Sequence, residues 1–199
     1  MMRVALIATF SALYCLITVL VVSRLIQPLD DIILPALLIS PDLSVILSAV
    51  SDILGTYIWL ILPIILFSTR KAVNFLIGSM ILINFTVSMA LKLVFMFVVP
   101  RPRPYMVLTS IFDANSYPSG HTMRAFAGST VFPLKINIFY IFTESVGVIT
   151  ALTRLLLGVH YFSDVLAGSF LGILIALVTN NRWVINFLNA ASRYIIREE

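Results

Sequence analysis

The stretch "YPSGHTMR", residues 117–124, places a histidine and a serine at the start of one apolar run and after another. A titratable ring and a hydroxyl are costly beside a membrane span unless they serve a function or find polar partners. The rest of the chain therefore decides between two interpretations of His121 and Ser119: part of a reactive site, or only a polar turn.

Composition predicts an integral membrane protein. The 199 residues are 60% hydrophobic and 11% charged, whereas a soluble domain carries about 25% charged residues. This length suits one domain over residues 1–199. The net charge of +4 comes from basic residues scattered singly, which argues against a nucleic-acid-binding face. The single cysteine, Cys15, lies in an apolar run and cannot form an intramolecular disulfide.

Apolar segments of about 20 residues indicate spanning helices. The predicted fold is an all-α bundle of six transmembrane helices, of which the fourth is short. The six segments are residues 4–26, 45–68, 72–99, 120–134, 137–157 and 161–179.

Two further segments are not predicted to span. Residues 28–41, "PLDDIILPALLISP", form a short apolar run that prolines interrupt. An interfacial segment after the first span is favoured over a simple loop. Residues 181–199 predict a helix lying on the membrane, with a polar tail as the alternative. The apolar face of that helix would hold Val184, Phe187, Leu188, Ala191 and Ile195.

Basic residues predict the orientation. With six spans and a cytoplasmic N-terminus, both termini are cytoplasmic, and seven of the thirteen basic residues share that side: Arg3, Arg70, Lys71, Lys135, Arg182, Arg193 and Arg197. The histidine turn falls on the other side, with Asp30, Asp31, Asp42, Asp113 and Asp164. Five cations gather at that outer end against the usual trend: Lys92, Arg101, Arg103, Arg124 and Arg154. A bound anion is the simplest explanation.

The stretch "TRLLLGVHYFSD", residues 153–164, contains the other of the two histidines. His160 and Asp164 have the spacing that shares a helical face. A carboxylate there can accept a hydrogen bond from one imidazole nitrogen, which leaves the other nitrogen as a nucleophile. Arg154 offers a planar fork suited to phosphate oxygens.

The stretch "KLVFMFVVPRPRP", residues 92–104, alternates Arg101 and Arg103 with prolines, which makes the segment stiff and non-helical. Ser119 and Gly120 could add backbone N–H donors, because glycine allows a close approach to an anion at a helix start. An anion cradle with two imidazoles suits phosphoryl transfer through a covalent phosphohistidine.

The elements "RPRP", "PSGH" and "R-x5-H-x3-D", in this order, resemble the type 2 phosphatidic acid phosphatase family, whose superfamily includes glucose-6-phosphatase and the vanadium haloperoxidases. The resemblance implies that His160 is the nucleophile, that Asp164 orients it, and that His121 is first a general acid and then a base. It implies that phosphate is held by Arg103, Arg154, Ser119 and the Gly120 backbone, with help from Arg101. It also implies catalysis without a metal ion or cofactor.

Lys92 departs from the family pattern, in which six residues separate a lysine from Arg-Pro. Counting back from Arg103 reaches Met96, and Lys92 lies four residues earlier, a rise of about 6 Å along a helix. Lys92 could still reach phosphate, cap carbonyls or meet an acidic partner. Arg124 could supply part of the missing charge. Asp52 and Glu144 also lie within predicted spans, and neither is assigned a role.

The expected function is hydrolysis of the terminal phosphate of a membrane lipid phosphate or diphosphate, at the extracytoplasmic face of a multi-pass cell-membrane protein. Isoprenyl diphosphate, phosphatidate and phosphatidylglycerol phosphate are the candidates; the first is favoured on family habit alone. The lipid and its bilayer are the expected partners, with no nucleic acid and no obligate protein. The alternatives are a lipid phosphotransferase with the same intermediate and a non-catalytic lipid-phosphate binding protein.

Overall fold

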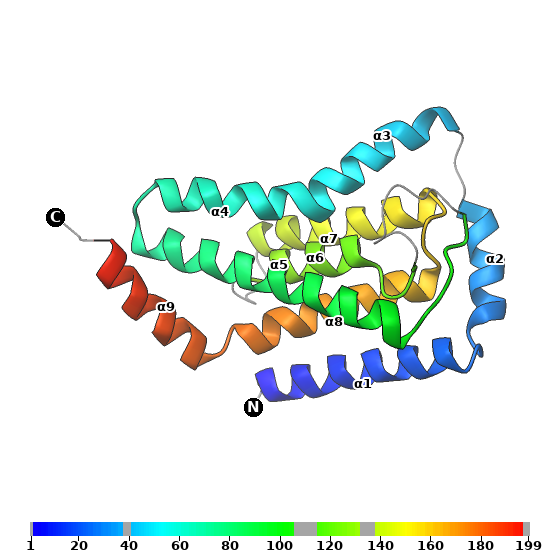
Figure 1. Cartoon of the computed structure of the whole chain (residues 1–199), viewed down its shortest axis with the longest axis horizontal. Coiled ribbons are helices and arrows are strands. Elements are labelled where there is room, and N and C mark those ends of the chain that lie inside the picture. Colours follow the sequence, from blue (N-terminus) through cyan, green and yellow to red (C-terminus); the bar gives the residue numbers. More distant parts are fainter. Residues whose placement is uncertain (1, 38–40, 106–114, 132–137, 197–199) are drawn as a thin grey trace.

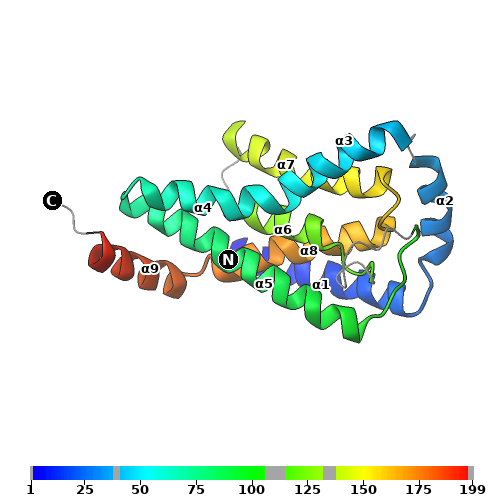
Figure 2. The same ribbon diagram turned by 45° about the horizontal axis from the view of Figure 1, so that its top comes forward.

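The computed structural model describes residues 2–37, 41–105, 115–131 and 138–196. Helices dominate these parts of the chain, and the longer ones pack as a bundle (Figure 1). Helix α2 (Gln27–Leu37) crosses one end of the bundle, where α1 (Met2–Val22) ends. The turned view shows the same arrangement (Figure 2). The all-α prediction is confirmed for the described residues.

Four helical segments in the described residues are long and apolar enough to span a membrane. They are α1, the continuous stretch Leu43–Ser68, α5 (Ala72–Val98) and α8 (Phe162–Thr179). They match the first, second, third and sixth predicted spans. The second span is built from three pieces: α3 (Pro41–Asp52), the π-helical turn η1 (Ile53–Tyr57) and α4 (Ile58–Ser68).

The six-span prediction is not confirmed. The predicted fourth span coincides with α6 (Gly120–Ser129), a helix of 10 residues, which is about 15 Å long against a hydrocarbon core of about 30 Å. The predicted fifth span coincides with α7 (Ile138–Leu156), which is not among the four spanning segments. Residues 132–137, between α6 and α7, lie outside the described residues. Asp113, Lys135 and Arg197 do too, so the side of the membrane predicted for them stays a prediction.

Helix α6 is a buried core helix, and its sequence is less apolar than those of the spanning segments, with a histidine, an arginine and several small or hydroxyl residues. All of its residues except His121 are buried. Two glycines of α8 let the α6 backbone come close: a Cβ at Gly168 would lie 2.6 Å from the Ser119 carbonyl oxygen, and one at Gly172 would lie 2.4 Å from that of Met123. Small residues permit such close helix packing inside membranes.

Residues 182–195 of the predicted C-terminal segment form a helix, α9 (Arg182–Ile195), and not a frayed tail. Val184 and Leu188 pack against the cluster around Trp59, whereas Phe187 and Ile195 are exposed. The predicted apolar face is therefore divided between the bundle and the surroundings. Its position on a membrane surface stays a prediction, as does the interfacial position of α2.

Candidate active site

The three sequence motifs meet at the end of the bundle that α2 crosses. The Ser119 amide, at the start of α6, donates to the Asp164 carbonyl oxygen at 3.0 Å. Arg103 Nη1, on the segment after α5, donates to the Val159 carbonyl oxygen at 3.4 Å, directly before His160. The predicted gathering of motif residues is therefore present in the structure.

His160 lies fully inside this end, with a side chain 1% exposed. Its Nδ1 is 3.8 Å from Asp164 Oδ2, which is too long for a hydrogen bond. Nδ1 has no hydrogen-bond partner among the described residues. The predicted His160–Asp164 pair is thus adjacent, without the predicted hydrogen bond.

The electrostatic surroundings of His160 favour its neutral form. His160 lies outside the four spanning segments. Burial, followed by the positive charges of Arg103, Arg154 and Lys92, lowers the pKa of His160 well below the ordinary value of histidine. A neutral imidazole is the form that can act as a nucleophile.

Arg101 makes different contacts from those expected. Its Nη1 donates to Asp164 Oδ1 and Ser163 Oγ, each at 2.7 Å. Its Nη2 donates to Asp30 Oδ2 and Gln27 Oε1, each at 2.8 Å. The guanidinium therefore bridges two buried carboxylates, where the sequence analysis had expected help with phosphate binding.

Asp30 completes this arrangement, and the sequence analysis assigned it no role. Its side chain is 0% exposed. Oδ1 accepts from the Ser163 amide at 2.9 Å, and Oδ2 accepts from Ser163 Oγ at 2.6 Å. Arg101 also stacks over the Tyr161 ring, with 4.0 Å between Cζ and the ring centroid. The network joins α2, the segment after α5 and the start of α8. The only signal in the sequence was an acidic pair at the start of the segment 28–41.

Arg154 lies within electrostatic reach of His160, and Ser119 lies directly before α6; their predicted contact with phosphate stays a prediction. Arg154 is buried on the last turn of α7, and its Nη1 donates to Ser51 Oγ of α3 at 3.2 Å. The Oγ atoms of Ser119 and Thr122 are 2.9 Å apart. Ser119 precedes α6, whose first turn receives no side-chain cap from it. The first backbone N–H groups of a helix lack intrahelical partners and can bind an anion; in α6 the Gly120 N–H is the first of these.

Lys92 supports the loop before α6. Its Nζ donates to the carbonyl oxygens of Asn115 at 2.9 Å, Pro118 at 3.0 Å and Tyr117 at 3.3 Å. Carbonyl capping, one of the three open roles, is the contact that the structure shows. Lys92 nevertheless lies close enough to His160 to act on it electrostatically.

His121 has an acidic partner that the motifs did not predict. Its Nε2 is 3.0 Å from Oδ1 of Asp52, the last residue of α3. Arg124 contacts the turn that follows: its Nε donates to the Gly55 carbonyl oxygen at 3.0 Å, and its Nη2 donates to Thr56 Oγ1 at 2.8 Å. The one signal for Asp52 in the sequence was an ionisable residue inside a predicted span.

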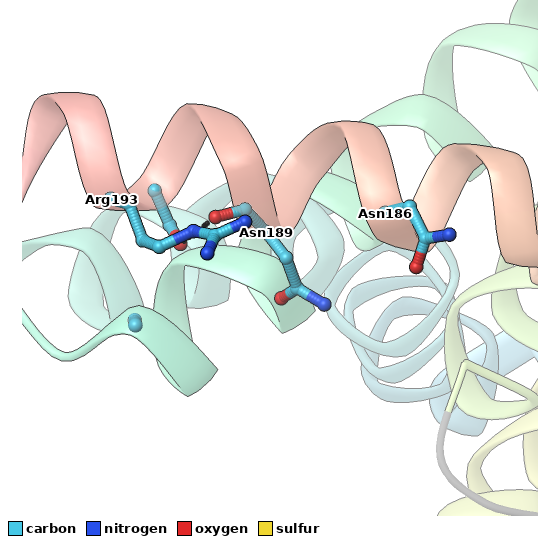
Figure 3. A pocket seen from close by; sticks show the side chains of 5 residues that line it. Asn186, Asn189 and Arg193 are labelled. Carbon is cyan, nitrogen blue, oxygen red and sulfur yellow. Dashed lines mark hydrogen bonds between the residues drawn. The ribbon is translucent and has the colours of Figure 1, made fainter.

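One pocket of the molecule lies apart from these groups. An open pocket of about 420 Å³ is lined by Ala72, Asn186, Asn189, Ser192 and Arg193, where α5 begins beside α9 (Figure 3). It contains none of the predicted site residues. Within the described residues, no group of three or more His, Cys, Asp or Glu side chains could hold a metal ion.

The sequence pattern of the PAP2 superfamily matches residues 72–187, more than half of the chain. The chain belongs to the PAP2 superfamily. The matched region includes all three motifs. With four spanning segments, this PAP2 protein is a multi-pass membrane protein.

Solved structures share the fold. A crystal structure of a transmembrane PAP2-type phosphatidylglycerolphosphate phosphatase from Bacillus subtilis is 23% identical, with a TM-score of 0.67, over 99% of this chain and 98% of that one. The crystal structure of Aquifex aeolicus LpxE is 23% identical, with a TM-score of 0.60, over 77% of this chain and 93% of that one. At this identity the likeness concerns the fold alone.

A sequence relative is the lipid A 1-phosphatase of Porphyromonas gingivalis, which is 41% identical over 66 residues. The match covers 31% of this chain and 15% of that protein. The chain therefore spans only a small part of the relative's length.

Proposed function

We propose that this PAP2 protein, a single domain over residues 1–199, is a membrane phosphatase that removes the terminal phosphate of a lipid phosphate or diphosphate. The observation that carries the proposal is the setting of His160. It is a buried imidazole beside the Asp164 carboxylate, in the positive field of Arg103 and Arg154. This combination suits a neutral nucleophile that attacks an anionic phosphoryl group.

In the proposed reaction, His160 Nε2 attacks phosphorus and forms a P–N bond while the P–O bond to the lipid breaks. His121 donates a proton to the departing oxygen. Arg103, Arg154 and the N-terminal amides of α6 stabilise the charge on the other phosphoryl oxygens. Asp164 stabilises the positive charge that forms on the His160 ring. Water then gives a proton to His121 and attacks phosphorus, which breaks the P–N bond and releases inorganic phosphate.

For the substrate, we favour an isoprenyl diphosphate over phosphatidate and phosphatidylglycerol phosphate, a preference that rests on family habit. The names of the Bacillus and Porphyromonas relatives keep phosphatidylglycerol phosphate in the panel and add lipid A to it. In this proposal the site opens on the extracytoplasmic side, both termini are cytoplasmic, and the reaction needs no metal ion or cofactor.

A non-catalytic lipid-phosphate binding protein is the weaker alternative. Its support in the sequence was the displaced Lys92, and the contacts of Lys92 with three carbonyl oxygens give that residue a supporting role. A phosphotransferase would use the same phosphohistidine and pass the group to a lipid or sugar acceptor in place of water.

The test is the release of inorganic phosphate by the purified full-length protein in vesicles, with EDTA present. The panel contains an isoprenyl diphosphate, phosphatidate, phosphatidylglycerol phosphate, lipid A and a soluble phosphate ester. We expect release from at least one lipid, and a loss of at least about 1,000-fold in His160→Ala. The matched control is Asp31→Asn, an exposed change on α2. No release from any lipid by the folded wild type contradicts hydrolysis, and release that an added acceptor suppresses indicates transfer.

A further inference from the structure

Asp52 touches the His121 ring although it belongs to none of the three motifs. It comes from the second span, 69 residues before His121, and its Oδ1 lies 3.0 Å from His121 Nε2. The carboxylate side chain is 42% exposed and the imidazole 22% exposed. The pair is therefore less enclosed than the His160–Asp164 pair, whose side chains are 1% and 0% exposed.

The other charged groups around His121 oppose a proton on its ring. His121 is the second residue of α6 and lies outside the four spanning segments. Burial, with Arg154 from α7 and Arg124 from α6 itself, lowers the pKa of His121, and the Asp52 contact raises it. His160 also lies within electrostatic reach. Among these groups, Asp52 is the one that favours the protonated ring.

The turn after Asp52 is built to fit this contact. The π-helical turn Ile53–Tyr57 follows Asp52 directly, and such turns are frequent at functional sites. A Cβ at Gly55 would lie 2.8 Å from both Cβ and Cδ2 of His121, so only glycine allows this approach of the backbone. Arg124 fixes the same turn through the Gly55 carbonyl oxygen and Thr56 Oγ1. The position of Asp52 beside His121 is therefore fixed from both helices.

We propose that Asp52 is a positioning residue for the leaving-group proton: it holds His121 through Nε2–H and keeps a proton available on Nδ1. This inference rests on the proposed function. The Nδ1 proton passes to the departing lipid oxygen as the P–O bond breaks, which leaves a neutral ring still bonded to Asp52. Water returns a proton to Nδ1 when it attacks the phosphohistidine, which restores the starting pair.

The kinetic test uses two substrates with the same tail and phosphate, one an alkyl ester and the other an aryl ester. An aryl oxygen leaves as a stable anion and needs little help from a proton donor. In Asp52→Asn we expect kcat for the alkyl ester to fall about 10- to 100-fold, because a general acid contributes about 100- to 10,000-fold in full. We expect KM for both esters, and kcat for the aryl ester, to stay within about threefold of the wild-type values.

The pH profile supplies a second readout. Removal of a negative charge disfavours the imidazolium, so the alkaline limb of kcat/KM for the alkyl ester moves to lower pH in Asp52→Asn. The control Asp31→Asn leaves both the limb and kcat unchanged.

In a His121→Ala background, Asp52→Asn has no further effect on kcat, because the two residues act as one unit. An equal loss with both esters, or an additional loss in that background, overturns the inference.

A measurement without turnover separates this inference from the proposed function. The chain has only two histidines, so His160→Gln leaves a single imidazole for NMR titration in a protein purified without a histidine tag. We expect the Asp52→Asn change to move the His121 titration to lower pH. An unmoved titration overturns the inference even if the wild type is an active phosphatase. If the titration moves but the wild-type protein releases no phosphate, the His121–Asp52 contact is supported and the proposed phosphatase function is contradicted.

Discussion

The two imidazoles of the site have opposite surroundings. The His160 side chain is 1% exposed, and its neighbour Asp164 is 0% exposed. The His121 side chain is 22% exposed, and its neighbour Asp52 is 42% exposed. Each ring thus lies beside a carboxylate. The carboxylate beside His160 is enclosed and forms an ion pair with Arg101, whereas the carboxylate beside His121 is partly exposed.

This contrast fits two chemical tasks. A nucleophile that stays neutral benefits from exclusion of water, whereas a group that exchanges protons with a leaving lipid and with water has to stay within reach of both. The enclosed region (His160, Asp164, Arg101 and Asp30) is held by charge pairs from three elements. The open region (His121 and Asp52) is held by the contact between these two side chains, by a close backbone approach at Gly55 and by the hydrogen bonds of Arg124 to the same turn.

The largest expected effect comes from changing Asp164, the carboxylate beside the proposed nucleophile His160. Asp164→Asn should lower kcat about 1,000- to 10,000-fold, because an amide in place of the carboxylate no longer stabilises the charged His160 ring; the reference for this size is the serine-protease triad. The measurement is phosphate release under saturating lipid. A loss no larger than that of Asp52→Asn would show that the two carboxylates do not differ in the way that their burial suggests.

The second effect concerns the stability of the enclosed region. Asp30→Asn leaves Arg101 buried beside one carboxylate in place of two, and breaking a buried ion pair costs about 3–5 kcal/mol. We expect a clear fall in the midpoint of thermal unfolding in detergent. Asp31→Asn, one residue along the same helix and exposed, is the matched control and should change the midpoint little. Equal midpoints for the two variants would contradict the network.

The third prediction separates the two roles of Lys92. If Lys92 mainly holds the loop before α6, Lys92→Met leaves carbonyl oxygens unpaired and lowers the free energy of unfolding by about 2 kcal/mol. KM for the lipid should then stay within about twofold of the wild type. A KM that rises tenfold or more at unchanged stability would instead indicate that Lys92 contacts the phosphate of the substrate directly.

The smallest effect is the titration of the enclosed imidazole. Because burial and the nearby arginines lower its pKa, His160 should stay neutral as the pH falls below about 6.5, the ordinary value. The unfolded chain then binds the proton more readily than the folded one, so the free energy of unfolding falls as the pH drops below that value. NMR of His121→Gln, which leaves His160 alone, measures the titration directly. A midpoint at 6.5 or above would contradict the enclosure.

The sequence predicted the four long spans and the meeting of the three motifs, because both depend on strong local patterns. It did not separate α6 from a span, because α6 and the apolar residues that follow it in the sequence were counted as one segment in spite of a histidine and an arginine. Arg101 was placed at the site but expected near phosphate, because a guanidinium suits carboxylate and phosphate equally. Asp52 and Asp30 were missed as partners because their contacts join residues 69 and 133 positions apart.

The long separation between Asp30 and Ser163 also sets the order in which the protein can be completed. At a synthesis rate of about 5–20 residues per second, Asp30 is made roughly 7 to 27 seconds before its last partner, Ser163. Until α8 has been made, α2 carries a carboxylate, Asp30, that still lacks its hydrogen bonds with Ser163. The end of the bundle that α2 crosses is therefore completed only after α8 has been made, and a chain halted before α8 lacks the Ser163 partner of Asp30.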